Sequence, residues 1–231
     1  MRTQSQKLDQ SRGIVESDYG YPQNYRVKDI NEQIDILCTI FPQLDRREVT
    51  IPSRLPEGAE GWFAIPRWEA ISRGEKALLL ELQNLLQCRY GYTNVYEEYK
   101  RWQQEHMVIS QKLRRALEWY YNQQQHDILV IPAQLGRKYV GLSATQALSA
   151  MSGLEFPLGI LEVSVLLLTH PERLSTANDL VLVAPGNGYF DGAQCYSAQC
   201  GLGSQGLIFS MRANNEFAPY KGVVSGFYLV I

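Results

Sequence analysis

The stretch with the clearest potential for chemistry is LEVSVLLLTHPERL, residues 161–174, in which an apolar run ends in His170 and Glu172. Asp179 follows seven residues after Glu172. A histidine beside carboxylates can act as a general base whose orientation a carboxylate fixes. These residues would form the centre of a small hydrolase or transferase, with His170 exposed in a concave pocket. The spacing singles out no nucleophile among the hydroxyl and thiol groups nearby, which belong to Ser164, Thr169, Ser175 and Cys195.

The same residues also allow a structural interpretation, which we favour. Apolar side chains would cover most of the circumference of a helix over residues 158–168, so this helix should be buried on nearly all sides. Pro171 disfavours helical backbone at His170 and should therefore end the helix there. His170 would then bond a carbonyl group at the helix end, and Arg173 would pair with Glu162 or Asp179.

Aromatic residues are the second feature that could serve a function, because the chain has 14 Tyr and 4 Trp. They concentrate in GWFAIPRW (61–68), RYGYTNVYEEYKRW (89–102) and EWYY (118–121), with basic residues nearby. Aromatic and arginine side chains together are typical of protein interfaces and of surfaces that stack single-stranded nucleic acid. A stripe of aromatic core residues would produce the same pattern. The residues that such a binding surface would use are Trp62, Arg67, Trp68, Tyr99, Trp102, Arg114 and Arg115.

Metal and phosphate sites have little support in the sequence. Cys195 and Cys200 are five residues apart rather than the three of a zinc knuckle, and the three histidines fall on different expected elements. A phosphate-binding loop opens a helix, whereas the glycine-rich stretches APGNGYFDG (184–192) and CGLGSQG (200–206) lie among expected strands. We therefore expect no metal and no cofactor, and we interpret PGNG (185–188) as a hairpin turn.

The elements that would position these residues change in kind along the chain. Apolar residues recur at helical spacing up to about residue 175, whereas short β-rich runs separated by Gly, Asn and Pro follow from about residue 180. The pattern predicts an α+β protein in which a helical N-terminal two-thirds packs on a β-rich, antiparallel C-terminal third. A polar N-terminal arm over residues 1–24 should precede a single α+β domain over residues 25–231.

Three expected elements matter for the candidate sites. The spacing predicts one long helix over about residues 95–122, which would carry much of the aromatic and basic surface. DILVIPAQLG predicts a buried strand from Ile128 to Ile131 that Pro132 stops. The C-terminal strands are too few to close a core alone, so they should pack against the buried helix of residues 158–168.

Composition and charge narrow the functional classes. The chain of 231 residues has a formal net charge of −2 at pH 7, so it lacks the global positive field that most nucleic-acid-binding proteins carry. The longest apolar run, residues 158–168, is about half the length that a membrane span needs and includes Glu162. The first ten residues are polar, unlike a signal peptide, and the four cysteines are few for this length. We expect a cytoplasmic protein with free thiols and no membrane contact.

Three spaced motifs carry a resemblance to other proteins. They are GWFAIPRWE (61–69), LVIPAQ (129–134) and LLTHPERL (167–174), with a Gly226–Phe227 pair near the C-terminus. Over roughly residues 55–230 the chain resembles a group of uncharacterised bacterial proteins that recur in small-genome bacteria and on mobile elements. The resemblance implies a shared fold, and it implies no known activity, cofactor or catalytic residue.

We therefore expect a non-enzymatic binding or accessory protein that acts through the aromatic and basic face of the long helix, with another protein as its partner. Two alternatives stay open. One is the hydrolase or transferase centred on His170, Glu172 and Asp179. The other is a nucleic-acid-binding protein, whose binding would weaken with salt and depend on Arg114 and Arg115. The oligomeric state does not follow from the sequence.

Overall fold

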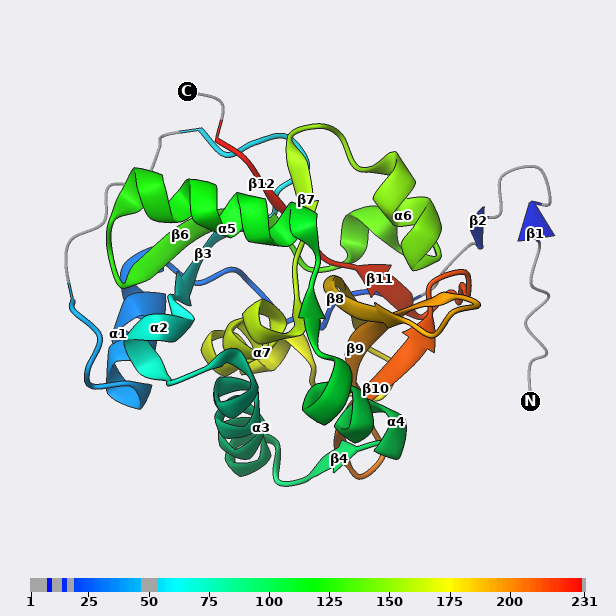
Figure 1. Ribbon diagram of the computed structural model, residues 1–231, viewed down its shortest axis with the longest axis horizontal. Coiled ribbons are helices and arrows are strands. Elements are labelled where there is room, and N and C mark those ends of the chain that lie inside the picture. Colours follow the sequence, from blue (N-terminus) through cyan, green and yellow to red (C-terminus); the bar gives the residue numbers. More distant parts are fainter. Residues whose placement is uncertain (1–7, 10–13, 16–18, 47–53, 230–231) are drawn as a thin grey trace.

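The computed structural model describes residues 8–9, 14–15, 19–46 and 54–229, which combine helices with two main sheets (Figure 1). Its α-helices are α1 (Ile30–Ile40), α2 (Trp68–Ile71), α3 (Glu75–Tyr90), α4 (Glu97–Arg101), α5 (Gln111–Gln124), α6 (Ala144–Ala150) and α7 (Ile160–Thr169). Shorter helical turns are the π-helix η1 (Trp102–His106) and the 3-10 helices η2 (Arg137–Tyr139) and η3 (Pro171–Arg173).

One main sheet has four antiparallel strands in the order β3-β6-β12-β7. These strands are β3 (Gly61–Pro66), β6 (Ile128–Gln134), β7 (Glu155–Pro157) and β12 (Ser225–Phe227). This four-stranded sheet therefore combines segments from the middle of the chain with one from its end.

The other main sheet has six strands and mixes parallel with antiparallel pairs. Its strands are β4 (Thr93–Val95), β5 (Val108–Ile109), β8 (Val181–Phe190), β9 (Cys195–Gly203), β10 (Gly206–Ala213) and β11 (Lys221–Val223). Strands β8, β9 and β10 are antiparallel neighbours, whereas β11 runs parallel to β8 and β4 runs parallel to β10. Separately, β1 (Leu8–Asp9) pairs with β2 (Ile14–Val15).

This arrangement contradicts the predicted fold class. The α-helices do lie in the N-terminal region and the middle of the chain, and strands dominate its C-terminal half. However, β3 and β6 belong to the first two-thirds, and the six-stranded sheet is not purely antiparallel. The prediction of a helical two-thirds packed on an antiparallel third was therefore wrong. Strand pairing joins distant segments, such as Gly61 with Ala133, and periodicity within one segment carries no information about such pairing.

Helix α7 lies at the centre of the molecule, where it contacts α3, α1 and strands of both main sheets (Figure 1). All ten of its residues are buried. The helix ends at Thr169, His170 is its C-cap, and Pro171 opens the 3-10 turn η3, as the proline predicted. The expected packing of the C-terminal strands on this helix is present, and β3 is an additional neighbour.

The predicted long helix over residues 95–122 is broken, so this prediction was wrong. After α4 and the π-turn η1, the chain leaves the helical conformation and forms β5, in which Val108 pairs with Gly188 of β8. Ser110 then caps a new helix, because its Oγ accepts a hydrogen bond from the Leu113 N–H (3.2 Å). Pairing with β8 thus interrupts a segment in which the apolar residues recur at helical spacing throughout.

Strand β6 does not stop at Pro132, contrary to the prediction, but continues to Gln134. Trp62 of β3 lies opposite Pro132. The Trp62 carbonyl faces away from β6 and accepts from the side-chain amide of Gln33 (2.8 Å), so β3 requires no N–H donor from residue 132. The same glutamine accepts from the Ala64 N–H (2.9 Å), and it thereby satisfies the outer edge of β3.

The PGNG stretch is a bulge within β8 and not the predicted hairpin turn. The pairing of β8 with β9 shifts register between Ala184 and Gly188, and the two strands are joined only after Phe190. Inside the bulge, the Asn187 Oδ1 accepts from the Ile160 N–H (2.8 Å) at the start of α7. The Gly186 N–H donates to the Leu158 carbonyl (2.9 Å). The glycines therefore allow β8 to approach the N-terminus of the central helix closely.

Part of the predicted arm over residues 1–24 lies outside the described residues. Within the part that is described, Gly20 forms a β-bridge with Asp179, and the ring of Tyr21 packs against the main hydrophobic core. The segment from residue 19 onward is thus attached to the body of the protein.

Candidate functional site

His170 is fully buried, and both of its ring nitrogens have partners. Nε2 accepts a hydrogen bond from the backbone N–H of Lys28 (3.0 Å), and Nδ1 lies 2.9 Å from Thr169 Oγ1. Because Nε2 accepts, we assign the proton of the neutral ring to Nδ1, which donates to the Thr169 hydroxyl. Burial, and then the nearby Lys28 ammonium, lower the pKa of His170 to about 4. The ring is therefore neutral at pH 7 and ties the segment before α1 to the end of α7.

Glu172 and Asp179 use their carboxylates for local structure. The Glu172 carboxylate forms an ion pair with the Lys28 ammonium. Asp179 Oδ2 accepts from the backbone N–H groups of Ser175 and Thr176 (both 2.6 Å) and so closes a tight turn. Neither set of hydrogen bonds involves the imidazole ring.

The catalytic alternative also required a pocket that exposes His170. A groove of about 770 Å³ lies between α1 and α3, but Lys28 and Thr169 line it rather than His170. The structure thus places the three predicted catalytic residues near one turn without assembling them into a catalytic set.

The aromatic residues of the predicted binding surface are not gathered on one face. Tyr99 and Trp102 are fully buried, with ring centroids 5.1 Å apart, and Tyr99 also packs against Phe209 of β10 (5.6 Å). Trp62 and Trp68 are half-buried. These aromatic rings therefore belong to the core, as the alternative interpretation of the pattern held.

The arginines of that surface are also dispersed. The half-buried Arg67 stacks on the ring of Tyr121 (4.5 Å) and donates from Nη2 to the Tyr121 carbonyl (2.9 Å). Arg114 and Arg115 are exposed on α5. Of the seven residues proposed for binding, only these last two present their side chains mainly to solvent.

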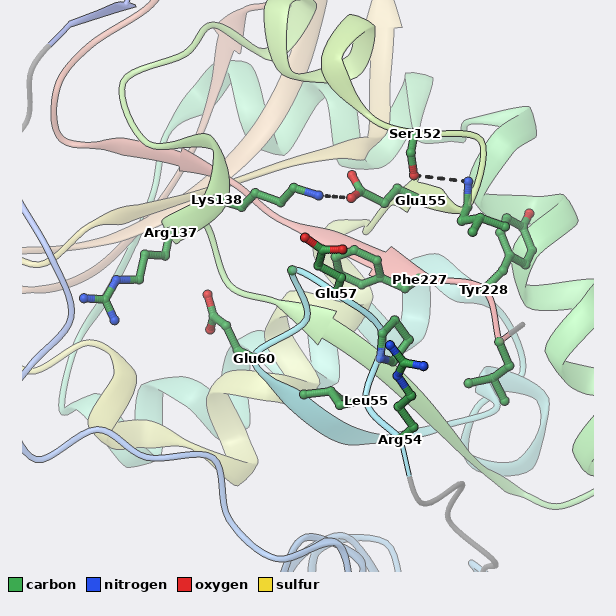
Figure 2. A pocket seen from close by; sticks show the side chains of 14 residues that line it. Arg54, Leu55, Glu57, Glu60, Arg137, Lys138, Ser152, Glu155, Phe227 and Tyr228 are labelled. Atoms are coloured by element: carbon green, nitrogen blue, oxygen red, sulfur yellow. Dashed lines mark hydrogen bonds and ion pairs between the residues drawn. The ribbon is translucent and has the colours of Figure 1, made fainter. Parts of the chain in front are cut away.

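A larger cleft, of about 1070 Å³, lies beside the four-stranded sheet (Figure 2). Its volume is slightly above the usual range for small-molecule sites, roughly 300–1,000 Å³. Its walls come from the loop before β3, the turn after β6, the loop between α6 and β7, and the end of β12. Its apolar lining consists of Leu55, Pro56, Leu154, Phe227, Tyr228 and Leu229.

One polar wall of this cleft is formed by an ion pair that lies next to the aromatic rings of Tyr139 and Phe227. The Lys138 ammonium pairs with Glu155 Oε1, and the Tyr139 hydroxyl donates to Glu155 Oε2. Glu155 is only 2% exposed, so these two donors replace its hydration. The ammonium also lies 5.2 Å from the centroid of the Phe227 ring. Burial, with the hydrogen bond to Glu155, raises the pKa of Tyr139 and keeps its hydroxyl a donor.

The second polar group of the cleft is centred on Glu60. Its Oε1 accepts from the Tyr21 hydroxyl (2.5 Å), and that hydroxyl accepts from the backbone N–H of Arg137 (3.1 Å). The fully buried guanidinium of Arg173 lies 3.9 Å from the centroid of the Tyr21 ring and donates to the Leu135 carbonyl (2.7 Å). Arg173 thus stacks on an aromatic ring rather than pairing with a carboxylate as predicted. Burial raises the pKa of Glu60, while Tyr21, the backbone of Leu135 and then Arg173 and Arg137 oppose that shift.

Gln134 fixes the turn that carries both polar groups. Its Oε1 accepts from the N–H groups of Gly136 (2.8 Å) and Lys138 (3.3 Å), and its Nε2 donates to the Val223 carbonyl (2.7 Å). This buried amide ends β6 and holds the Arg137–Lys138 turn against the last strands. The cleft therefore combines a rim of charged groups with an apolar floor.

Sequence reasoning missed this cleft because its lining is spread over four segments between residues 54 and 229. Each segment resembles an ordinary loop or strand end when it is considered alone. One signal was present, namely the charged pair Arg137–Lys138 directly after a buried strand and a glycine.

Comparisons with known proteins assign no function to this site. No protein family, no curated protein and no solved structure matches the chain. Within residues 8–9, 14–15, 19–46 and 54–229, no three His, Cys, Asp or Glu side chains are grouped so that they could hold a metal ion. Across the same residues, no helix has the length and apolar character that crossing a lipid bilayer requires.

Proposed function

We propose that this chain is a non-enzymatic binding protein whose cleft holds a small organic anion with an apolar body. One observation carries the proposal. In a single cleft, an apolar floor adjoins two guanidinium groups, those of Arg54 and Arg137, that form no ion pair with a carboxylate among the described residues. A ligand carboxylate would supply the missing partner.

The charges of the other groups support this ligand class. The Lys138 ammonium is engaged by Glu155, so it adds little attraction for a ligand. Arg137 rests 5.7 Å from the centroid of the Tyr21 ring, which positions the guanidinium without neutralising it. A planar guanidinium binds a carboxylate through two parallel hydrogen bonds, which makes arginine better suited to this role than lysine.

The hydrogen bonds that the polar groups of the cleft already form favour binding over catalysis. Lys138 and Tyr139 both bond to Glu155, so these three groups already have partners within the protein. The hydrolase or transferase alternative has less support, because the ring nitrogens of His170 are both occupied inside the protein.

A protein or nucleic-acid partner, as inferred from the sequence, is also less well supported than a small molecule. That inference relied on aromatic side chains, and Tyr99 and Trp102 belong to the core. We propose the cytoplasm as the location, in keeping with four cysteines that are all free thiols.

The test is an NMR titration of the isotope-labelled full chain with 4-phenylbutyrate, 4-phenylbutanamide and (4-phenylbutyl)trimethylammonium. These probes share an apolar body and differ in charge. We expect the carboxylate to bind about tenfold more tightly than the amide, with shifts confined to the cleft, because one charged hydrogen-bonded pair contributes roughly 1.4 kcal/mol. Arg137→Gln should remove this preference, whereas Arg73→Gln, at an exposed arginine outside the cleft, should preserve it. Equal binding of all three probes, or shifts outside the cleft, would refute the proposal.

A further inference from the structure

Building on the proposed function, we infer that the ligand carries a hydrogen-bond-donating amine as well as its carboxylate, and that Glu60 binds this amine. The ligand class is then a short peptide with free ends, or an apolar amino-acid derivative of similar size. The inference rests on the geometry of one carboxylate at the wall of the cleft.

The two oxygens of Glu60 are in different situations. Oε1 accepts from the Tyr21 hydroxyl (2.5 Å), whereas Oε2 is buried and has no hydrogen-bond partner among the described residues. Glu60 lines the cleft, so a ligand is in a position to reach this residue. A buried carboxylate oxygen without a donor is costly, and a ligand N–H group would remove that cost.

The position of Glu60 is held from several sides. Its backbone N–H donates to the Ala133 carbonyl (2.8 Å), which anchors the residue at the start of β3. Its partner Tyr21 is held in turn by the Arg137 N–H and by the buried guanidinium of Arg173 against its ring. This support leaves the carboxylate in a preorganised orientation, which is what a binding site for a small cation needs.

The buried cation behind Tyr21 favours a charged rather than a neutral Glu60. Arg173 is fully enclosed, and its Nε and Nη1 have no partner in the described part of the chain. The positive charge of Arg173 acts to lower the pKa of Glu60, but burial acts more strongly in the opposite direction and raises it. A ligand ammonium would offset this cost of the negative charge.

The rim of the cleft carries both signs of charge. Arg54 and Glu57 lie on the loop before β3, and Figure 2 shows this loop facing the Lys138–Glu155 pair across the cleft. Glu60 lies at the end of the same loop. A molecule with one positive and one negative end can thus meet a carboxylate and a guanidinium at once, while its apolar part covers the floor. A simple fatty or aryl carboxylate would leave Glu60 Oε2 without a donor.

Three peptide probes test this inference by calorimetric titration of the full chain. They are leucyl-phenylalanine, its N-acetyl derivative, which lacks the ammonium, and its C-terminal amide, which lacks the carboxylate. In the wild-type protein we expect the free dipeptide to bind about tenfold more tightly than the N-acetyl derivative.

Variants separate the role of charge from that of size. Glu60→Gln keeps an acceptor for Tyr21 but removes the charge, so the ratio between the free and the acetylated dipeptide should approach one. The bulk of the acetyl group is unchanged in this variant, so a purely steric effect would leave the ratio as it was. Glu81→Gln, at an exposed position on α3, should retain the wild-type ratio.

The outcomes distinguish this inference from the proposed function. If wild-type protein binds both N-terminal forms equally but still prefers the carboxylate over the amide, the role of Glu60 is refuted and the anion-binding cleft stands. If no probe binds, both ideas fall. If Glu60→Gln proves unstable, the wild-type comparison can still refute the role of Glu60, because equal binding of the two N-terminal forms would leave no effect for its charge to explain.

Discussion

His170 offers the sharpest test of the structure, because its catalytic and structural roles predict opposite results. The ring lies between Phe63 (5.3 Å between centroids) and Tyr25 (6.2 Å), and its Nε2 accepts from the Lys28 N–H. His170→Ala would leave that N–H buried without a partner and remove both ring contacts. His170→Gln reaches about as far and can accept through its side-chain oxygen.

The magnitude follows from these contacts. An unpaired buried N–H group costs about 1–3 kcal/mol, and each aromatic contact contributes about 0.5–1.5 kcal/mol beyond the area it buries. We therefore expect His170→Ala to lower the free energy of unfolding at pH 7.5 by about 3 kcal/mol. His170→Gln should lower it by about half as much, because the acceptor for Lys28 is retained.

The pH dependence provides an independent check. The pKa of His170 is lowered from 6.5 to about 4, so between these values the unfolded chain binds a proton that the folded protein does not. The stability from this group is therefore fully present above pH 6.5 and is lost as the pH falls towards 4. At 1.36 kcal/mol per pH unit the loss amounts to about 3 kcal/mol.

The assay is urea denaturation of the wild type and His170→Gln at several pH values between 4.5 and 7.5. The difference in unfolding free energy between the two proteins isolates the histidine from all other titrating groups. This difference should shrink as the pH falls and change sign below about pH 5.5, because the loss of about 3 kcal/mol exceeds the advantage of about 1.5 kcal/mol at pH 7.5. A constant difference at every pH, or a His170→Ala variant as stable as the wild type, would show that the ring is not held as described.

Three further predictions concern the centre and the surface of the molecule. Burial raises the pKa of Glu162 from 4.5 to about 7, so between these pH values the folded protein retains a proton that the unfolded chain loses. The free energy of unfolding should therefore fall by up to about 3 kcal/mol as the pH rises through that window. Glu162→Gln should remove this decline in denaturation curves recorded from pH 5 to pH 8. In Gly186→Ala the new Cβ would lie 2.6 Å from the Gly159 backbone nitrogen, so the thermal midpoint should fall by several degrees, whereas Gly74→Ala has open space and should change little. Replacing the exposed Arg114 and Arg115 together by Glu should change the unfolding free energy by less than about 0.5 kcal/mol. If that variant instead loses a measurable, salt-sensitive affinity for single-stranded DNA, the nucleic-acid alternative regains support.

Some of this architecture could be predicted because it depends on local causes. The unbroken apolar run identified α7 as a buried helix, and Pro171 located its end, since proline restricts the backbone of the residue before it. Ser143 begins α6 with a capping box formed with Gln146. Each of these features is decided by residues within one or two helical turns of each other.

Other predictions were wrong where a distant segment decides the local conformation. The segment around Val108 has helical spacing but forms β5, because β8 offers a strand partner. Pro132 continues β6 because it lies opposite Trp62, whose carbonyl faces away from β6, so its missing N–H removes no hydrogen bond to β3. In the first place strand pairing outweighs a local preference of about 1 kcal/mol or less, and in the second the register of the two strands leaves no need for the missing donor.

By itself, the sequence determined the presence of a buried central helix, its proline-defined end and a β-rich stretch from about residue 180, because these follow from the order of neighbouring side chains. Only the tertiary structure decided that Tyr99 and Trp102 belong to the core, and that Glu60 and Arg137 meet at one cleft. The reason is physical. The hydrophobic effect buries apolar side chains of any helix and sheet faces that pack together, whatever their distance in the sequence. The pairing of β3, β6, β7 and β12 likewise brings together residues that no local pattern connects.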